Sequence, residues 1–410
     1  TDICIAGQDM RILYINSVCK SGSTGKIVYS LYTSVNEHGG EAAVCYGRGA
    51  ELREKNIYKF GLDAETVLHA GLTRITGFTG CFSALSTRRL LRFMDEFKPD
   101  IIHLHEPHAY FVDLGPLFRY IKKRRIPLVY TFHCEFAYTG KCGVTYGCTR
   151  WQAGCGHCPA LHEYPKTLFF DFTARMWQEK RSLLREQNMV VCTPSEWLET
   201  RVRQSFLSGF DVRVVPNGID TALFCTRPYA HLRERHGLTN ERVVLAVAPH
   251  IMSRLKGGRD VLRLAESMKN ENVKFILIGV DDLSESFPEN VIAMGRTENQ
   301  QELAEYYSMA DVFVICSAME NLPTTCIEAV CCGTPVAGFD VGGTAETAPA
   351  PMGKFCAFGD IDALRNNVIG FLNDPPAAEL LETARVRYSA EQMYERYSSI
   401  YDELLKENKL

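Results

Sequence analysis

Short apolar runs alternate with longer amphipathic stretches through the first half of the chain. The runs read RILYINS, EAAVCYG, DIIHLH, PLVYTFH, MVVCTPS and VRVVPNG, at residues 11–17, 41–47, 100–105, 127–133, 189–195 and 212–218. Runs of this length without polar alternation are typical of parallel strands that are buried on both faces. Because helical patterns separate several of them, this half predicts βαβ units and a doubly wound sheet.

The same alternation restarts after a polar stretch near residues 216–240. The second series of runs reads RVVLAVAP, VKFILIG, VIAMG, ADVFVICS and PVAGFD, at residues 242–249, 273–279, 291–295, 310–317 and 335–340. We therefore predict two Rossmann-like α/β domains, at residues 10–215 and 216–388, with ligands bound in a cleft between them. Residues 389–410 have helical spacing, and we expect this helix to pack across the domain junction.

Length and composition are those of a two-domain globular protein. The chain has 410 residues, of which 46% are hydrophobic and 23% charged, and its formal charge is −4. This balance gives no reason to expect a nucleic-acid partner. No apolar run approaches the ~20 residues of a membrane-spanning helix, so we expect a cytoplasmic protein.

Residues 1–9 precede MRILYINS and are set aside as an upstream extension.

The segment SAMENLPTTCIEAVCCGTPV, residues 317–336, carries two acids on either side of a predicted helix start. Pro323 suits a first helical turn, and Gly333 suits the position after the last turn. Free backbone N–H groups near Thr324 and Thr325 would attract a phosphate. Glu320 and Glu328 could each accept hydrogen bonds from sugar hydroxyls, which together describes a nucleotide sugar. A purely structural strand–loop–helix explains this segment equally well when it is considered alone.

The surrounding motifs favour the nucleotide sugar. VVPNGIDTALF, LKGG, ENLPTTCIEA, GTPV and DVGGTAE follow one another at residues 214–224, 255–258, 320–329, 333–336 and 340–346. In this order they resemble the retaining glycosyltransferases of family 4, over nearly the whole chain. The resemblance implies the GT-B fold, in which two doubly wound parallel-sheet domains face a central cleft. The carboxy-terminal domain of such enzymes binds the nucleotide sugar, and the amino-terminal domain binds the acceptor.

The resemblance also implies roles for individual residues. Glu328 would hold the ribose and Glu320 the donor sugar, while Lys256 would neutralise the diphosphate. Arg254 is the nearest match to a family arginine that normally follows a glycine, and no Gly-Arg pair is present here. The donor-binding set implied by the resemblance and by the predicted helix start comprises Gly25, Lys26, Gly295, Arg296, Asn321, Leu322, Thr324, Thr325 and Glu328.

Histidines end two of the predicted strands in the amino-terminal half. By the resemblance His133 lies beside the reacting sugar, although a structural histidine at a strand end is the simpler interpretation. His105 and His108 resemble residues on the acceptor side, and we do not expect a metal there. The nearby SGSTGK, residues 21–26, lacks the Walker spacing of a nucleotide triphosphatase and is predicted to be a glycine loop that approaches the diphosphate.

Four of the sixteen cysteines lie close together in the segment GKCGVTYGCTRWQAGCGHCP, residues 140–159. Cys142, Cys148, Cys155 and Cys158 could hold a structural Zn²⁺ within a loop at residues 134–165, because four thiolates suit a closed tetrahedral site. His157 and Cys134 are alternative ligands. One or two disulfides, or free thiols, remain alternatives to zinc. The segment resembles a family 4 branch that acts in capsule, O-antigen and colanic-acid-type polysaccharide synthesis.

The sequence therefore predicts a retaining hexosyltransferase that uses a nucleotide-diphosphate sugar, with a UDP-sugar favoured. Its acceptor would be a saccharide or a lipid-linked saccharide in bacterial surface polysaccharide synthesis, without a catalytic metal. The basic stretch FRYIKKRR, residues 118–125, would give peripheral contact with the inner membrane face, or it is a solvated helix end. An epimerase or phosphorylase of the same fold and an inactive zinc-binding scaffold are the alternatives.

Overall fold

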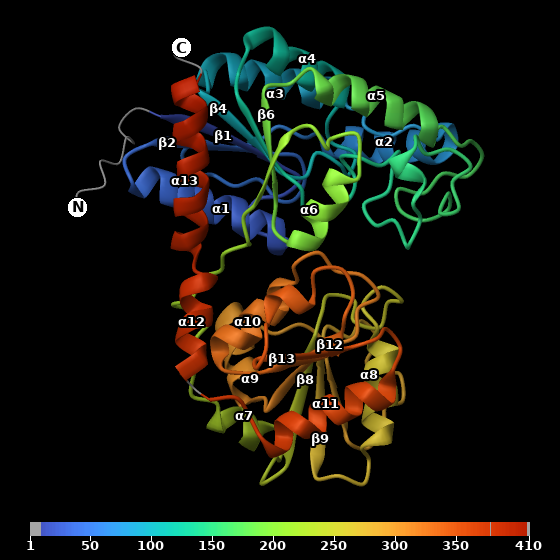
Figure 1. Ribbon diagram of the computed structural model, residues 1–410, viewed down its shortest axis with the longest axis vertical. Helices are drawn as coiled ribbons and strands as arrows, with labels where there is room; N and C mark the ends of the chain where they lie inside the picture. Colours follow the sequence, from blue (N-terminus) through green and yellow to red (C-terminus); the bar gives the residue numbers. More distant parts are fainter. Residues whose placement is uncertain (1–9, 378, 408–410) are drawn as a thin grey trace. The chain divides into compact units, whose positions relative to one another are not determined.

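The computed structural model describes residues 10–377 and 379–407, and the upstream extension at 1–9 lies outside them. The chain forms two compact units, shown in Figure 1. Unit 1 comprises the chain up to Pro216 together with the chain from Met393 onward, and unit 2 is Asn217–Gln392. Each unit is a parallel sheet with helices packed on it, which confirms the predicted pair of doubly wound α/β domains.

Unit 1 is built on a seven-stranded sheet in the order β3-β2-β1-β4-β5-β6-β7. Its strands are β1 (Arg11–Asn16), β2 (Glu41–Tyr46), β3 (Ile57–Lys59), β4 (Ile101–Leu104), β5 (Leu128–Thr131), β6 (Met189–Thr193) and β7 (Asp211–Val214). All pairs are parallel. The strand order reverses between β1 and β4, so loops after these strands and after β5 meet at one edge of the sheet.

Most helices of unit 1 bury apolar side chains, whereas the buried residues of α2 are Thr66, His69 and Thr73. They are α1 (Gly22–Glu37), α2 (Asp63–Thr76), α3 (Ala84–Phe97), α4 (Leu114–Arg124), α5 (Thr173–Arg185), α6 (Glu196–Arg203) and most of α13 (Ala390–Glu407). In α1 the buried Ile27, Val28, Leu31 and Val35 have helical spacing. The predicted glycine loop is wrong in extent, because α1 already begins at Gly22 and SGSTGK therefore forms its first turns.

Helix α13 is fixed to unit 1 by apolar packing and by buried hydroxyl groups. Its residues Met393, Ile400 and Leu404 belong to the core cluster that also contains strands β1 and β2. The Tyr401 hydroxyl lies 3.2 Å from the Tyr14 hydroxyl and 2.7 Å from His103 Nδ1. Helix α13 therefore completes the core of the first unit, where its apolar residues share a cluster with those of α1.

Unit 2 is built on a six-stranded parallel sheet in the order β10-β9-β8-β11-β12-β13. Its strands are β8 (Arg242–Val247), β9 (Val273–Ile278), β10 (Val291–Met294), β11 (Val312–Ile315), β12 (Val336–Phe339) and β13 (Gly353–Cys356). The strand order reverses between β8 and β11, which are neighbours. The loops after these two strands therefore flank the point where a doubly wound sheet usually binds its ligand.

The helices of unit 2 cover both faces of its sheet. They are α7 (Ala230–Arg235), α8 (Gly258–Ser267), α9 (Gln300–Met309), α10 (Thr324–Cys332), α11 (Ile361–Asn373) and α12 (Glu379–Arg387). Helix α10 ends at Gly333, whose φ of 102° is left-handed, as the sequence predicts. Pro323 precedes the first turn of α10 as its N-cap, one position earlier than expected.

Candidate active site

The predicted donor-binding residues of unit 2 gather at the carboxyl ends of β8, β10 and β11. Lys256 comes from the loop between β8 and α8, and Glu320 comes from the loop between β11 and α10. Lys256 Nζ donates a hydrogen bond to Glu320 Oε1 at 2.6 Å, and both side chains are partly buried. The structure therefore brings together a cation and an acid that lie 64 residues apart in the chain.

Two glycines lie so close to the backbone of another loop that no side chain would fit. Gly257 has a φ of 71°, and a Cβ atom there would lie 1.9 Å from the carbonyl oxygen of Cys316. A Cβ atom on Gly342 would lie 1.7 Å from the carbonyl oxygen of Glu320. Because no side chain fits at either position, the glycines of the LKGG and VGGTAE motifs are required to hold the loops of Lys256 and Glu320 in place.

The start of helix α10 carries the remaining donor residues of this segment. Thr324 and Thr325 are its first two residues, so their backbone N–H groups lie in the first turn. Glu328 follows on the second turn and is buried, with 7% of its surface exposed. The Tyr307 hydroxyl of α9 donates to Glu328 Oε2 at 3.0 Å. A buried acid thus lies just behind a helix end that favours anions.

Asn321 and Leu322 join Glu320 to this helix, and Leu322 is buried among the core residues of unit 2. Gly295 follows β10, and its carbonyl accepts a hydrogen bond from Gly279 N at 2.9 Å. The side chains of Arg254 and Arg296 are exposed to solvent. Arg254 therefore lies in the same loop as Lys256 but is not buried with it.

In unit 1 the predicted histidine lies beside a second histidine. His133 follows β5 and His105 follows β4, and these strands are parallel neighbours. His105 Nδ1 and His133 Nε2 are 2.9 Å apart, and the two rings are stacked with centroids 5.2 Å apart. Burial lowers the pKa of His133 below its ordinary value, although the Glu106 carboxylate opposes this shift. Burial lowers the pKa of His105 further, so both rings are neutral at pH 7.

Gly25 and Lys26 lie on the second turn of α1. Gly25 is buried, and a Cβ atom there would lie 3.1 Å from Val18 Cγ2 and 3.3 Å from Lys20 N. The Gly25 carbonyl accepts a hydrogen bond from Lys20 N at 3.1 Å. Lys26 is exposed. Gly25 therefore shapes the turn between β1 and α1, and Lys26 projects from the helix into solvent.

The four predicted zinc ligands lie in one region, but they do not form a ligand set. A hydrogen bond between the Cys142 and Cys158 thiols lowers the pKa of Cys158 to about 6. Cys155 Sγ accepts a hydrogen bond from Gly140 N at 3.2 Å. Within residues 10–377 and 379–407, no three of these four sulfurs come within 4.8 Å of one another, and none forms a disulfide. Zinc at this site stays a prediction.

Two buried lysines donate hydrogen bonds to backbone carbonyls of the cysteine-rich loop. Lys141 Nζ donates to the carbonyls of Leu161, Glu163 and Pro165, at 2.7, 3.0 and 2.7 Å. Lys180 Nζ donates to the carbonyls of Phe136 and Thr139, at 2.6 and 2.9 Å. Trp151 and Tyr138 are also fully buried in this loop. Lysine hydrogen bonds and two aromatic rings therefore contribute to fixing this loop.

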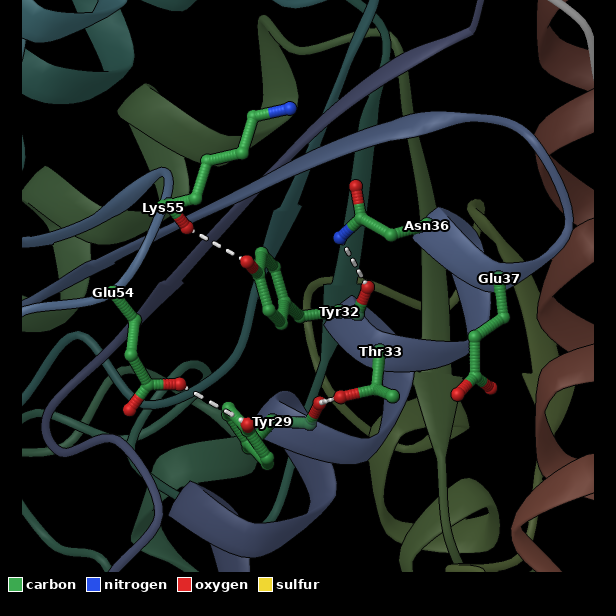
Figure 2. Close-up of a pocket in the computed structure, with 7 residues that line it drawn as sticks. All are labelled: Tyr29, Tyr32, Thr33, Asn36, Glu37, Glu54 and Lys55. Atoms are coloured by element: carbon green, nitrogen blue, oxygen red, sulfur yellow. Dashed lines mark hydrogen bonds between the residues drawn. The ribbon is translucent and has the colours of Figure 1, made fainter.

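A surface pocket of about 440 Å³ lies elsewhere on unit 1 (Figure 2). It is lined by Tyr29, Tyr32, Thr33, Asn36, Glu37, Glu54 and Lys55. Its hydroxyl groups are occupied, since Tyr29 donates to Glu54 at 3.1 Å and Tyr32 donates to the Lys55 carbonyl at 2.7 Å. None of the predicted site residues lines it, and we assign it no role.

The structure adds two features that the sequence did not indicate. Tyr307 supports Glu328 from another helix, α9. The sequence of α9, QQELAEYYSM, does not indicate that Tyr307 contacts Glu328. Glu106, His108 and Cys134 bring their ligand atoms within 4.8 Å of one another. In the sequence these residues follow two predicted strands, in the segments HLHEPH and PLVYTFHC. The cluster becomes visible only when these strands are known to be neighbours.

Comparison with known families agrees with this arrangement. The family profile described as Glycosyltransferase Family 4 matches residues 24–223, and the profile described as Glycosyl transferases group 1 matches residues 230–390. The two matches fall on unit 1 and unit 2 respectively. The chain belongs to the family 4 glycosyltransferases and is a transferase enzyme, as predicted.

Relatives with curated names include two bacterial enzymes. Colanic acid biosynthesis glycosyl transferase WcaC of Escherichia coli strain K12 is 24% identical over 426 residues, which cover 96% of this chain and 100% of the relative. Teichuronic acid biosynthesis glycosyltransferase TuaC of Bacillus subtilis strain 168 is 30% identical over 208 residues, or 50% of this chain and 48% of the relative.

Solved structures share the fold at low identity. Sucrose-phosphate synthase from Thermosynechococcus elongatus matches with a TM-score of 0.72 and 19% identity, over 97% of this chain and 99% of that one. Anabaena HepE in complex with UDP matches with a TM-score of 0.67 and 16% identity, over 96% and 100% of the two chains. These matches establish the GT-B fold. Among the described residues, no helix has the length and apolar character that a bilayer crossing requires.

Proposed function

We propose that this transferase moves a hexose from a nucleotide-diphosphate sugar, with UDP as the favoured nucleotide, and retains the anomeric configuration. The observation that carries the proposal is the arrangement in unit 2. Lys256 pairs with Glu320 beside the first turn of α10, and Tyr307 holds the buried Glu328 behind that turn. A cation, a helix N-terminus and two acids match the diphosphate and the hydroxyl groups of such a donor.

In this proposal negative charge builds on the leaving diphosphate as the glycosidic bond breaks. Lys256 and the N–H groups of Thr324 and Thr325 stabilise that charge, with Arg254 as a further contributor. Glu320 and Glu328 orient hydroxyl groups and do not act as an acid–base pair. The departing phosphate oxygen takes the proton from the acceptor hydroxyl on the same face of the sugar. No divalent cation is assigned to the leaving group.

The acceptor is a saccharide or lipid-linked saccharide of bacterial surface polysaccharide synthesis. The full-length similarity to WcaC, named for colanic acid biosynthesis, supports this proposal. His133 would hydrogen-bond to the reacting sugar, and the neutral His105 beside it would fix its ring. Anabaena HepE, which shares this fold, has been solved in complex with UDP and with UDP-glucose, and this supports a UDP-sugar as the first donor to test.

The donor is tested by the melting temperature of the full chain with a panel of nucleoside diphosphates and nucleotide sugars. A ligand at 100 times its Kd should add roughly 2.7 kcal/mol to the free energy of unfolding. We expect UDP and one UDP-sugar to shift the melting temperature most. The enzyme should also hydrolyse that nucleotide sugar slowly, and nuclear magnetic resonance can monitor the released sugar. An α-linked donor should give the α-anomer first. A larger shift with GDP, or a β-anomer product, would overturn the respective assignment.

We also propose peripheral contact with the inner membrane face, through a different surface from the predicted basic stretch. In α4, Lys122 pairs with Glu186 at 2.9 Å and Arg124 pairs with Asp95 at 2.5 Å, which favours a solvated helix end. Exposed apolar side chains lie instead on α2 and on the segment around Phe169. This segment is joined to the end of α2 by a hydrogen bond from Leu168 N to the Arg74 carbonyl. The exposed side chains include Val67, Leu68, Ile75, Phe169 and Phe170, exposed by 73, 57, 54, 67 and 52%.

Sedimentation with vesicles of phosphatidylglycerol and phosphatidylethanolamine tests this surface. Phe169→Ser together with Phe170→Ser should reduce the bound fraction several-fold, because each ring contributes buried apolar area. Leu283→Ser is the control, since Leu283 is 56% exposed in unit 2. Equal sedimentation of the double variant and the wild type would exclude this surface as the point of contact.

A further inference from the structure

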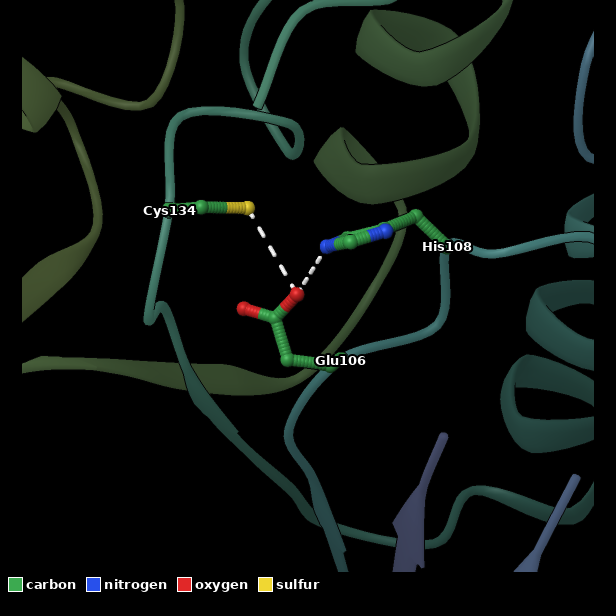
Figure 3. Close-up of side chains that lie close together, drawn as sticks. All are labelled: Glu106, His108 and Cys134. Atoms are coloured by element: carbon green, nitrogen blue, oxygen red, sulfur yellow. Dashed lines mark hydrogen bonds and ion pairs between the residues drawn. The ribbon is translucent and has the colours of Figure 1, made fainter. Parts of the chain in front are cut away.

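A cluster of three metal-ligating side chains lies at the carboxyl ends of two unit 1 strands, outside the donor site. It contains none of the four cysteines Cys142, Cys148, Cys155 and Cys158. Glu106 and His108 come from the loop after β4, and Cys134 comes from the loop after β5. Because β4 and β5 are parallel neighbours, these loops leave the same edge of the sheet. Figure 3 shows the three side chains pointing toward one another.

The distances within the cluster suit a single ion. The candidate ligand atoms all lie within 4.8 Å of one another, and Cys134 Sγ is 3.6 Å from Glu106 Oε2. His108 Nε2 contacts the same carboxylate oxygen. In a tetrahedral zinc site, bonds of roughly 2.0–2.3 Å place neighbouring ligand atoms about 3.3–3.8 Å apart. Only small movements of His108 would bring all three atoms onto one ion.

Burial also favours a bound ion here. Glu106 is buried, with 7% of its surface exposed, and His108 and Cys134 are partly buried. A buried carboxylate is normally paired or bound to a metal, so a cation at this cluster would compensate the charge of Glu106.

The geometry points to a Zn²⁺ site formed by Glu106, His108 and Cys134, with a fourth position open to an oxygen ligand. One thiolate, one imidazole and one carboxylate together favour zinc over Mg²⁺ or Ca²⁺, which prefer oxygen ligands alone. Three protein ligands with one open position distinguish this site from a closed structural one. The inference concerns metal binding and does not depend on the identity of the donor or the acceptor.

The alternative is an ion pair between His108 and Glu106 with no metal, and cobalt substitution separates the two. The metal-free full chain is titrated with Co²⁺, and absorption from thiolate-to-cobalt charge transfer is recorded in the near ultraviolet. The double variant Cys142→Ser, Cys158→Ser removes the paired thiols of the cysteine-rich loop. In that background we expect one Co²⁺ per chain to give the band, and Zn²⁺ to displace it.

In the same background Cys134→Ser should abolish the band, and Glu106→Gln or His108→Gln should weaken Co²⁺ binding at least about tenfold. Cys81→Ser is the matched control, because Cys81 is an exposed thiol of unit 1 outside the cluster. Far-ultraviolet circular dichroism checks that each variant is folded. A band that persists in Cys134→Ser, or no band in the loop double variant, would overturn the site.

A second measurement uses the wild-type chain, so it does not depend on any variant folding. Zn²⁺ should slow alkylation of Cys134 by iodoacetamide at least about tenfold, measured by mass spectrometry of its peptide, because a metal-bound thiolate is a poor nucleophile. The alkylation rate of Cys81 should not change. Equal rates for Cys134 with and without Zn²⁺ would contradict metal binding at this cluster.

Discussion

Glu328 lies in an environment unlike that of a surface acid. It is buried on α10, yet it has a hydroxyl donor in Tyr307 from the neighbouring helix. An ionised carboxylate in such a place needs hydrogen bonds, and a bound ribose could supply more of them. The donor-binding role of Glu328 and its support by Tyr307 can therefore be tested separately.

We predict that Glu328→Ala weakens UDP binding by roughly 1.5–3 kcal/mol, since a charge-assisted hydrogen bond to the ribose is lost. Tyr307→Phe should weaken it by less, about 0.5–1.5 kcal/mol, because the carboxylate remains but loses one neutral donor that positions it. Isothermal titration calorimetry with UDP measures both. Unchanged affinity in Glu328→Ala would remove this residue from the donor site.

Lys256 differs from the other lysines of unit 2 because it is partly buried against an acid of the site. We predict that Lys256→Gln lowers kcat about 10²-fold or more, because the positive charge that stabilises the leaving diphosphate is removed. The matched control is Lys269→Gln. The Lys269 side chain is 59% exposed and pairs with Glu266 outside the site. Steady-state kinetics of donor hydrolysis compare the two. Equal kcat values in both variants would contradict the role of Lys256.

At the scale of elements, helix α13 shows how the end of the chain is fixed to the first unit. His103 Nδ1 lies 2.7 Å from the Tyr401 hydroxyl, and His103 Nε2 lies 2.8 Å from Thr131 Oγ1. Thr131 Oγ1 in turn lies 2.9 Å from the Tyr397 hydroxyl. Every member of this network is buried. The helix is therefore joined to β1, β4 and β5 by specific hydrogen bonds in addition to apolar packing.

We predict that Tyr401→Phe lowers the free energy of unfolding by about 1–3 kcal/mol, because His103 Nδ1 loses its partner in a buried site. The conservative change keeps the ring and therefore the packing. Tyr29→Phe is the control, since the Tyr29 hydroxyl bonds to Glu54 at the surface and its loss should cost far less. Urea unfolding followed by fluorescence measures both variants. An equal, small effect in the two would show that the buried network contributes little.

Element prediction from the sequence succeeded where apolar runs are continuous and missed two short edge strands. Strands β1 and β8 were predicted because their cores are continuous apolar runs. Strands β3 and β13 were not predicted, because their sequences IYK and GKFC each contain a lysine and no continuous apolar run. The edge strand β10 has the similar length of four residues, but its sequence VIAM is wholly apolar and was predicted.

At the scale of the molecule, the two doubly wound units and the donor segments followed from sequence, because motif order and strand ends are local features. The Glu106–His108–Cys134 cluster could not be predicted in this way. It needs β4 and β5 to be neighbours, and adjacency is a property of the sheet. Tyr307 was missed for the same reason, since helix α9 meets α10 only in the folded unit.

Buried histidines should make unit 1 sensitive to acid. In unit 1, burial lowers the pKa of His69 to about 4, and burial holds the pKa of His103 well below its ordinary value. His69 accepts a hydrogen bond from Gly80 N at 3.0 Å through Nε2, which requires the neutral ring at that atom. Trp151, Trp177 and Trp197 are the three tryptophans of the chain, and all lie in unit 1. Tryptophan fluorescence therefore reports on this unit alone.

We predict that unit 1 is fully stable above pH 6.5 and loses stability as the pH falls from 6.5 toward 4. In that window His69 takes up a proton in the unfolded chain but not in the folded one, so acid favours unfolding. His69 alone can account for roughly 3 kcal/mol at most. His69→Gln keeps an acceptor for Gly80 N–H and removes the titration, so its stability should fall less steeply over the same range. Urea unfolding at pH 7, 6, 5 and 4, followed by tryptophan fluorescence, measures both slopes. Identical slopes for the variant and the wild type would show that a different group governs the acid sensitivity of unit 1.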